Sequence, residues 1–347
     1  MANPGSSGLS DISSALSQLF PKLQRNANRM SVLLESIPTE KGMGKNVSFD
    51  AELDGAKAGS RAEGADFIST DFAVDGILPA TLPWAEYGSA FQITHQAIDA
   101  SASSVGVDGS MSNQFGNRLM SSVGKIVSVQ NGDSWNGTGT DGSGNQNIIG
   151  ILGGMLDTTT AYGGISASGN PLWRANVNAS VGSLTVAKLA QMESNIYAAC
   201  GVHPNVIWAS DDVFALYSNL FEVNRRIVGS GPDLVYNTST TSLRFQDIAV
   251  LRDKDGYTGT LVMGHTDYIG KRFLPPAINQ SALSSTLIQV VIGAGDNGDS
   301  VKNPIGVPFR LDHLAKSGTS YKFALTGSMQ LVCTRRNAFG VMSGITA

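Results

Sequence analysis

The chain carries little charge. Asp, Glu, Lys and Arg make up 15% of its 347 residues, whereas about a quarter is usual for a soluble domain. A chain of this kind often hides much of its surface against partners. The net charge is -4, and the sequence contains no run or stripe of Lys and Arg. This composition gives no support for a protein that wraps nucleic acid by itself.

Cysteine and long apolar runs are also scarce. The two cysteines, Cys200 and Cys333, lie far apart, and we expect small buried residues in a reducing compartment rather than a disulfide. No apolar run approaches the roughly 20 residues that cross a membrane, so no membrane partner is expected. Residues 1–8 have neither a basic nor an apolar segment and therefore predict no secretory signal.

The patterns typical of catalytic, cofactor and metal sites are missing as well. The four histidines are isolated from one another and from cysteine, and no Gly-x-Ser-x-Gly nucleophile turn occurs. Residues 293–298 have the glycine spacing of a dinucleotide-binding turn, but Pro304 and Pro308 follow and no helical period does. We therefore expect no catalytic residue, no cofactor and no metal site. A hydrolase or ligand-binding enzyme of α+β fold, with a site built from distant residues, stays open as an alternative.

Residues 253–256 resemble part of a calcium-binding loop. However, Leu251 stands at the first ligand position and Val262 at the last, where the ion requires oxygen ligands. The segment is therefore interpreted as a hairpin turn.

The clearest local structure lies between residues 183 and 227. Thr185 is suited to cap a helix that Gly201 ends, and Val206 begins a short apolar run that suits a buried strand. A second helix is predicted after that strand. The apolar positions of the two helices recur at helical spacing: Leu189, Met192, Ile196 and Cys200 in the first, Phe214, Leu216 and Leu220 in the second. The pattern predicts a sheet with helices packed on it.

An amphipathic helix is predicted over residues 9–20, ending before Pro21. Its apolar stripe contains Ile12, Leu16 and Leu19. Such a stripe must be buried, either on the helix's own domain or on a neighbouring subunit, and the sequence leaves both open.

A long β-hairpin is predicted next. Apolar and polar residues alternate from 45 to 54 and again from 68 to 75, around a tip of small residues at 55–64. Because an isolated two-stranded ribbon is barely stable in water, we expect the hairpin to lie across another copy of the chain. The predicted subunit contacts are Ile12, Leu16, Leu19, Phe49, Leu53, Lys57, Arg61 and Phe72.

The rest of the chain mixes one long helix with strands, which gives an α+β fold class. The helix is predicted between residues 108 and 130, ending at Asn131 and Gly132, and a loop follows to about residue 147. A turn is predicted around Pro79 and Pro83. Strands are predicted at 91–94, 245–251, 259–264 and 287–292, with an alternating strand at 329–334. The apolar stripe of the helix contains Met111, Phe115, Leu119, Val123 and Ile126.

From about residue 45 onward, the order of several segments resembles the major capsid proteins of tailed bacteriophages, which have the HK97 fold. The segments are EGADF at residues 63–67, LPWAEY at 82–87 leading into FQIT at 91–94, GGML at 153–156, AYGGI at 161–165, PLWRA at 171–175, and the helix, glycine and strand that end at Trp208.

The resemblance implies a division of the chain into named parts. These are an N-terminal arm at 1–42, an extended hairpin (E-loop) with its flanking strand at 43–95, a spine helix of the P-domain at 96–131, an α/β A-domain at 132–272, and returning P-domain strands with the C-terminus at 273–347.

The resemblance also implies a function. It is that of a structural, non-enzymatic protein that self-assembles as pentamers and hexamers into an icosahedral phage head, a virion component assembled in the host cytoplasm. The head would enclose double-stranded DNA without sequence-specific binding. Scaffolding, portal and decoration proteins are further partners to consider. Some relatives join subunits through a Lys–Asn isopeptide bond, but no motif assigns an Asn partner to Lys57. An encapsulin-like nanocompartment is the alternative with the same fold.

Overall fold

The computed structural model describes residues 31–53, 63, 76–95, 110–224, 244–275, 290–292 and 309–346. The helices are α2 (Val32–Ser36), α4 (Ser110–Asn136), α5 (Val186–Cys200) and α6 (Asp211–Asn224). The strands are β1 (Thr39–Lys41), β2 (Asn46–Glu52), β3 (Ile77–Pro83), β4 (Ala85–Thr94), β5 (Thr138–Thr140), β6 (Gln146–Ile149), β7 (Asn176–Asn178), β8 (Gly182–Ser183), β9 (Val206–Ser210), β10 (Arg244–Phe245), β11 (Ile248–Asp253), β12 (Leu261–Gly264), β13 (Ile269–Phe273), β14 (Val290–Ile292), β15 (Phe309–Ser317), β16 (Ser320–Cys333), β17 (Gly340–Met342) and β18 (Ile345–Thr346). This mixture confirms the α+β class.

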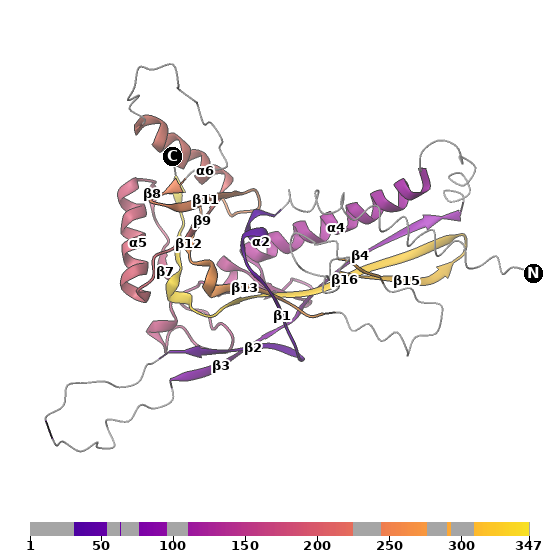
Figure 1. Ribbon diagram of the computed structural model, residues 1–347, viewed down its shortest axis with the longest axis horizontal. Coiled ribbons are helices and arrows are strands. Elements are labelled where there is room, and N and C mark those ends of the chain that lie inside the picture. Colours follow the sequence, from indigo (N-terminus) through magenta and orange to yellow (C-terminus); the bar gives the residue numbers. More distant parts are fainter. Residues whose placement is uncertain are drawn as a thin grey trace, which may run out of the picture.

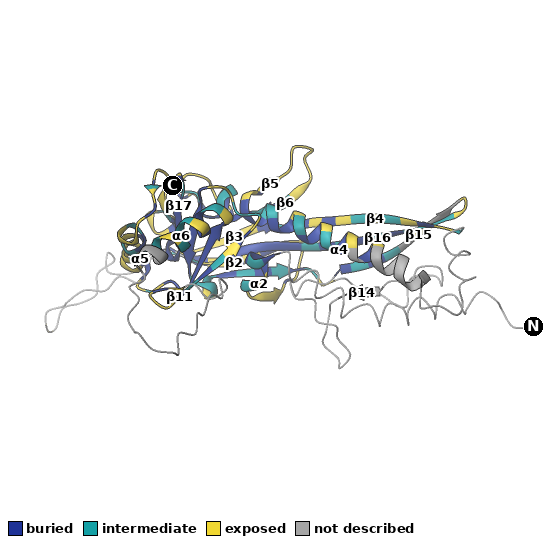
Figure 2. Cartoon of the chain, turned by 90° about the horizontal axis from the view of Figure 1, so that it is seen from above, coloured by how far each residue is buried: buried dark blue, intermediate teal, exposed yellow. Residues whose placement is uncertain are grey.

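A long arm of the molecule consists of one helix on one sheet. Strands β4 and β15 flank the 14-residue strand β16 on either side, all antiparallel, and β13 and β1 continue the sheet toward the rest of the molecule. Helix α4 lies along one face of this sheet (Figures 1 and 2). A strand of this length extends about 45 Å and a helix of 27 residues about 40 Å. We call this helix and sheet the arm.

Helix α4 confirms the predicted apolar stripe as far as its side chains are described. Leu119, Val123 and Ile126 are buried, while the side chains of Met111 and Phe115 lie outside the described residues. The predicted end at Asn131 and Gly132 is wrong, because the helix continues to Asn136. Asn131 does not end the helix, since its side chain is engaged in tertiary hydrogen bonds. The predicted loop after it contains the β5–β6 hairpin.

The second region is an α/β unit whose six strands are ordered β10-β11-β9-β12-β17-β7, with α5 and α6 packed on the sheet (Figure 1). The predicted helix is confirmed in detail. Thr185 accepts a hydrogen bond from the amide of Lys188 (3.3 Å), and Gly201 ends α5 with φ +72°. The predicted buried strand is β9, all five residues of which are buried.

Two further sequence predictions are wrong, one in this unit and one in the arm sheet. Strands β11 and β12 are not a hairpin, because β9 lies between them, parallel to β11 and antiparallel to β12. The turn after Asp253 therefore crosses the end of β9. The strand at 329–334 does not alternate in burial, since Met329 to Cys333 are all buried. It lies where the arm joins the other elements, so both of its faces are covered.

The hairpin differs from its prediction in its second strand. Strand β2 pairs with β3, from Asn46 opposite Pro83 to Glu52 opposite Ile77, whereas residues 68–75 lie outside the described residues. The prolines of β3 had indicated a turn. Since the amide of Thr81 points away from β2, to Gly163, the nitrogens of Pro79 and Pro83 also face away from β2, where proline is tolerated.

Candidate assembly surfaces

The base of the β2–β3 hairpin is held on its own subunit. The ring of Phe49 lies 6.2 Å from that of Tyr162, and the amide of Thr81 donates to the carbonyl of Gly163 (3.1 Å). Gly163 has φ +63°, and a Cβ there would lie 2.7 Å from the Cβ of Ala80. Glycine is required for both reasons. The loop that carries Tyr162 and Gly163 therefore sets the direction in which the hairpin leaves the subunit.

The sequence-predicted subunit contacts fall into two groups. Phe49 and Leu53 are 8% and 7% exposed and belong to the core of their own subunit. The expectation that the ribbon lies across another copy does not hold for its base, because the chain itself covers the apolar face there. The other six predicted contacts lie outside the described residues: Ile12, Leu16, Leu19, Lys57, Arg61 and Phe72.

Exposed apolar side chains of the hairpin are found on β3 instead. Ile77 is 60% and Leu78 is 39% exposed. Adjacent residues of a strand point to opposite faces, so this pair leaves apolar surface on both sides of the ribbon. The sequence reasoning missed these residues because it assigned Pro79 and its surroundings to a turn. The available signal was the pair of large apolar residues directly before that proline.

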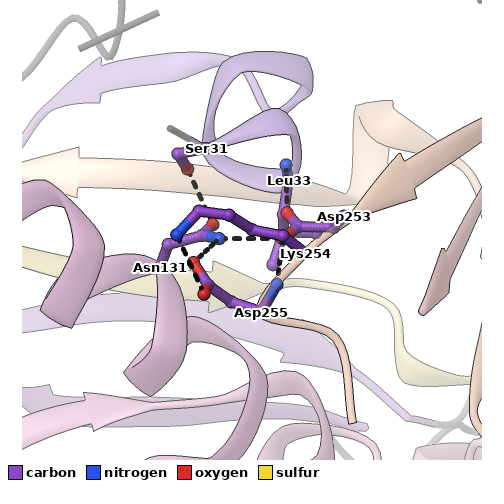
Figure 3. Close-up of polar contacts among 6 residues, drawn as sticks. All are labelled: Ser31, Leu33, Asn131, Asp253, Lys254 and Asp255. Atoms are coloured by element: carbon purple, nitrogen blue, oxygen red, sulfur yellow. Dashed lines mark hydrogen bonds and ion pairs between the residues drawn. The ribbon is translucent and has the colours of Figure 1, made fainter. Parts of the chain in front are cut away.

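A buried polar cluster joins the start of the described chain, the arm and the α/β unit (Figure 3). The Ser31 hydroxyl donates to Oδ1 of Asn131 (2.7 Å), and Nδ2 of Asn131 donates to Asp253 (2.9 Å) and Asp255 (2.8 Å). The other carboxylate oxygen of Asp253 accepts from the amide of Leu33 (2.9 Å). We call these five residues the junction cluster. It connects α2, α4 and the turn after β11, and so fixes the arm against the α/β unit.

The junction cluster also explains why the calcium-like segment needs no cation. The Asp253 carboxylate is buried and accepts three hydrogen bonds, the third from the amide of Asp255 (2.9 Å). Lys254 forms an ion pair with Asp255 (3.2 Å) at the outer edge. Negative charge in this turn is therefore balanced by donors of the protein itself. Within the described residues, no group of three or more His, Cys, Asp and Glu side chains could hold a metal ion.

Two buried cations also join segments that are distant in the sequence. Lys271 of β13 donates to the carbonyl of Leu34 in α2, and burial lowers its pKa to about 8. Arg336 lies 5.7 Å from the ring centres of both Tyr162 and Trp173 and donates to the carbonyl of Asp157. Both cations bind carbonyl groups of neighbouring segments. They hold together the elements from which the arm and the hairpin project.

The arm has its own polar contact between helix and sheet. The Tyr87 hydroxyl donates to Asp133 of α4 (2.7 Å) and accepts from the amide of Ile148 in β6 (3.0 Å). Burial raises the pKa of both Tyr87 and Asp133 above their ordinary values. Odd-numbered residues of β4 therefore face α4, and even-numbered residues such as Glu86 lie on the open face of the sheet.

A groove of about 270 Å³ is lined by polar residues such as Asp157 and Thr260 and by apolar residues such as Leu152. Hydrogen bonds, led by that from Thr160, lower the pKa of Asp157 to about 2, so it is a weak base at neutral pH. Both cysteines are buried and free, as expected. No helix among the described residues is long and apolar enough to cross a membrane.

Comparison with known proteins identifies the fold. The sequence matches no protein-family model and no curated protein. Among solved structures, it is similar to the subunit of the cyanophage A-1(L) capsid, with 17% identity, a TM-score of 0.71, and coverage of 90% of this chain and 91% of that chain. The capsid of a native GTA particle has 12% identity and a TM-score of 0.54, with 90% of each chain covered. The SrpI encapsulin of Synechococcus elongatus has 9% identity and a TM-score of 0.52, with 89% of this chain and 85% of that chain covered. The chain therefore has the HK97-like fold of these shell subunits, as its sequence predicted.

Proposed function

We propose that this chain is the major capsid protein of a tailed bacteriophage. Copies assemble as pentamers and hexamers into an icosahedral head that encloses double-stranded DNA, and the protein is a structural component of the virion with no enzymatic activity. The observation that carries the proposal is the likeness to the cyanophage capsid subunit over 90% of the chain. Fold alone does not determine function, so the surfaces of the molecule must support it too.

The shape of the subunit supports this function. An arm with an open sheet face and a hairpin with exposed Ile77 and Leu78 give one subunit much surface that a solitary globular protein would not need. Stable subunit contacts bury about 2,000 Å² or more, and projecting elements supply such area. The junction cluster holds these projections in a fixed relation, which a closed shell requires of every copy.

The proposal includes a division of the chain and a set of partners. The arm corresponds to a P-domain, the α/β unit to an A-domain within residues 132–272, and the hairpin to an E-loop within 43–95. Residues 1–42 would be an N-terminal arm, separate from the helix-and-sheet arm defined above, and its amphipathic stripe would contact a neighbouring subunit. Scaffolding, portal and decoration proteins are proposed partners, and the enclosed DNA is held without sequence-specific contacts.

The test is assembly of the full chain. Expressed protein, examined by electron microscopy and analytical ultracentrifugation, should form capsomers or closed particles, and Ile77→Asp should reduce assembly. Because Ile77 is exposed in the single subunit, the free energy of unfolding of the variant should lie within about 0.5 kcal/mol of that of the wild type. A protein that stays monomeric at high concentration would contradict the proposal.

An encapsulin-like compartment is a second candidate, favoured by the fold likeness to SrpI encapsulin. The contents of particles from producing cells separate the two functions. Nuclease-resistant duplex DNA inside the particles is expected for a phage head, whereas a protein cargo without DNA would favour the compartment.

A further inference from the structure

Helix α4 has an outward face that carries positive charge only. Four exposed positions in its described middle part recur at helical spacing: Arg118, Ser121, Lys125 and Val129. The chain has no Asp or Glu between residues 110 and 132. Arg118 and Lys125 lie about 10 Å apart along the helix axis. We call these four residues the α4 stripe.

The opposite broad face of the arm has a different electrostatic character. On strands β4, β15 and β16, the charged side chains that the structure describes on this face are Glu86, Lys322, Arg310 and Asp312, two of each sign, and the last two form an ion pair of 2.8 Å. The cross-strand register places them on the side of the sheet away from α4, because Tyr87 and Phe323 of the intervening positions are buried on the α4 side. The two faces thus differ by a net charge of about two, with the carboxylates on the sheet side.

Among the residues that the structure describes, the carboxylates near α4 lie toward its C-terminal end. Asp133 is engaged by Tyr87, Asp141 of the β5–β6 hairpin lies close enough to raise the pKa of Asp133, and α2 brings Glu35 to the junction cluster. The α4 stripe therefore begins where these groups end. Arg118 donates to the carbonyl of Gln92 at the side of the sheet and is itself exposed, so its charge remains at the surface.

We propose that the α4 stripe is the part of the subunit that meets the enclosed duplex DNA. This inference rests on the proposed capsid function, since a thin helix-on-sheet arm in a shell wall turns one broad face inward. Duplex DNA presents one phosphate charge per about 1.7 Å of its axis. A face with two cations and no carboxylate attracts it, whereas the sheet face has local repulsion to overcome from the exposed Glu86, and its Asp312 is half-buried and paired with Arg310. Two cations per subunit are too few to read sequence, and they suit contact with the phosphate backbone alone.

The experiment uses the full-length subunit and a 30-base-pair duplex, with binding followed by fluorescence anisotropy over a series of KCl concentrations. Lys125→Gln should weaken binding about three- to tenfold at low salt and lower the salt slope by about one phosphate contact. The matched control is Lys322→Gln. Lys322 pairs with Gln92 in the sheet, and so lies at the same level of the arm as Arg118 but on the opposite face. The control should bind like the wild type.

Each outcome bears on the inference. Loss with Lys125→Gln and none with Lys322→Gln supports it. Equal loss of duplex binding in both variants, or loss in neither, overturns it. The same titration with polyglutamate gives a third outcome. If Lys125→Gln weakens binding of polyglutamate but not of the duplex, the inference is overturned and the stripe is assigned to an acidic protein. Particle formation is scored separately. If particles form normally and neither lysine affects duplex binding, the capsid function stands and the inference about α4 fails.

Discussion

The α/β unit and the arm use the same kinds of elements but support them differently. Strand β9 is buried at all five positions, because other strands flank it and packed elements cover both of its faces. Strand β4 is buried or half-buried only at odd positions, and all of its even positions are exposed. One region is a closed core and the other is a two-layered slab with an open face. The difference indicates that β9 is fully enclosed by its own subunit, whereas the arm leaves one face open to contacts outside the subunit.

The largest expected effect comes from a substitution in the closed core of the α/β unit. Trp208→Ala should destabilise the protein by about 3–5 kcal/mol, since Trp208 is fully buried and its indole donates to Ser36 of α2 (2.8 Å). Phe323→Ala in the arm, where the ring stacks on Phe91 at 5.3 Å, should cost about 2 kcal/mol, because an open slab relaxes more easily than a closed core. Urea unfolding measures both. Equal losses would show that the arm is as tightly enclosed as the unit.

A second prediction concerns the junction between the two regions. Asn131→Ala should cost about 2–3 kcal/mol, because the buried carboxylate of Asp253 loses a donor and the Ser31 hydroxyl loses its acceptor. Asn136→Ala, on an exposed residue of the same helix, is the matched control and should cost about 0.5 kcal/mol or less. Similar losses in both variants would mean that the effect comes from the helix and not from the junction cluster.

The sequence predicted the α/β unit more accurately than the junction between the two regions. In the α/β unit, local signals agreed with tertiary packing. Helix α5 begins after Thr185 and ends at Gly201 as predicted, and β9 is buried as predicted. At the junction, long-range contacts overrode local signals, so Asn131 continues a helix that it was expected to end. No local pattern reveals that an asparagine side chain will bond to a carboxylate more than 100 residues away.

The candidate surfaces were predicted less well than the fold. Alternation in the hairpin correctly indicated a strand at β2, but alternation does not say whether the apolar face meets the same chain or another one. Phe49 turned out to contact Tyr162 of its own subunit. The exposed pair on β3 was hidden by Pro79, because proline indicates a turn unless the neighbouring strand and its register are known.

The third prediction concerns how stability depends on pH through the buried Lys271. The pKa of Lys271 is about 8 in the folded chain and 10.5 ordinarily. Between these values the unfolded chain binds more protons, so the contribution of this group makes the protein more stable as pH rises. The slope is at most about 1.4 kcal/mol per pH unit.

Lys271→Met provides the reference for this measurement. Burial also raises the pKa of Cys333 to about 12, which acts in the opposite direction above pH 9, but equally in both proteins. The free energy of unfolding of the wild type minus that of Lys271→Met should therefore rise between pH 8 and pH 9. A difference independent of pH would show that Lys271 stays charged in the folded chain.

The smallest expected effect is at the base of the hairpin. Gly163→Ala and Gly164→Ala both place a side chain at positive φ, +63° and +84°, which costs about 1 kcal/mol in each. Only the first would bring its Cβ within 2.7 Å of Ala80 on β3, whereas nothing lies within 4 Å at the second. The difference in free energy of unfolding between the two variants therefore isolates the docking of the hairpin, and it should be about 1 kcal/mol.

Hydrogen exchange gives a second measurement of this docking. In Gly163→Ala the amide of Thr81, which donates to residue 163, should exchange with solvent faster, while amides of β9 are unchanged. Equal exchange at Thr81 in both variants would mean that the hairpin is held by the Phe49 contact alone, and that its direction is set by the core of the subunit and not by this loop.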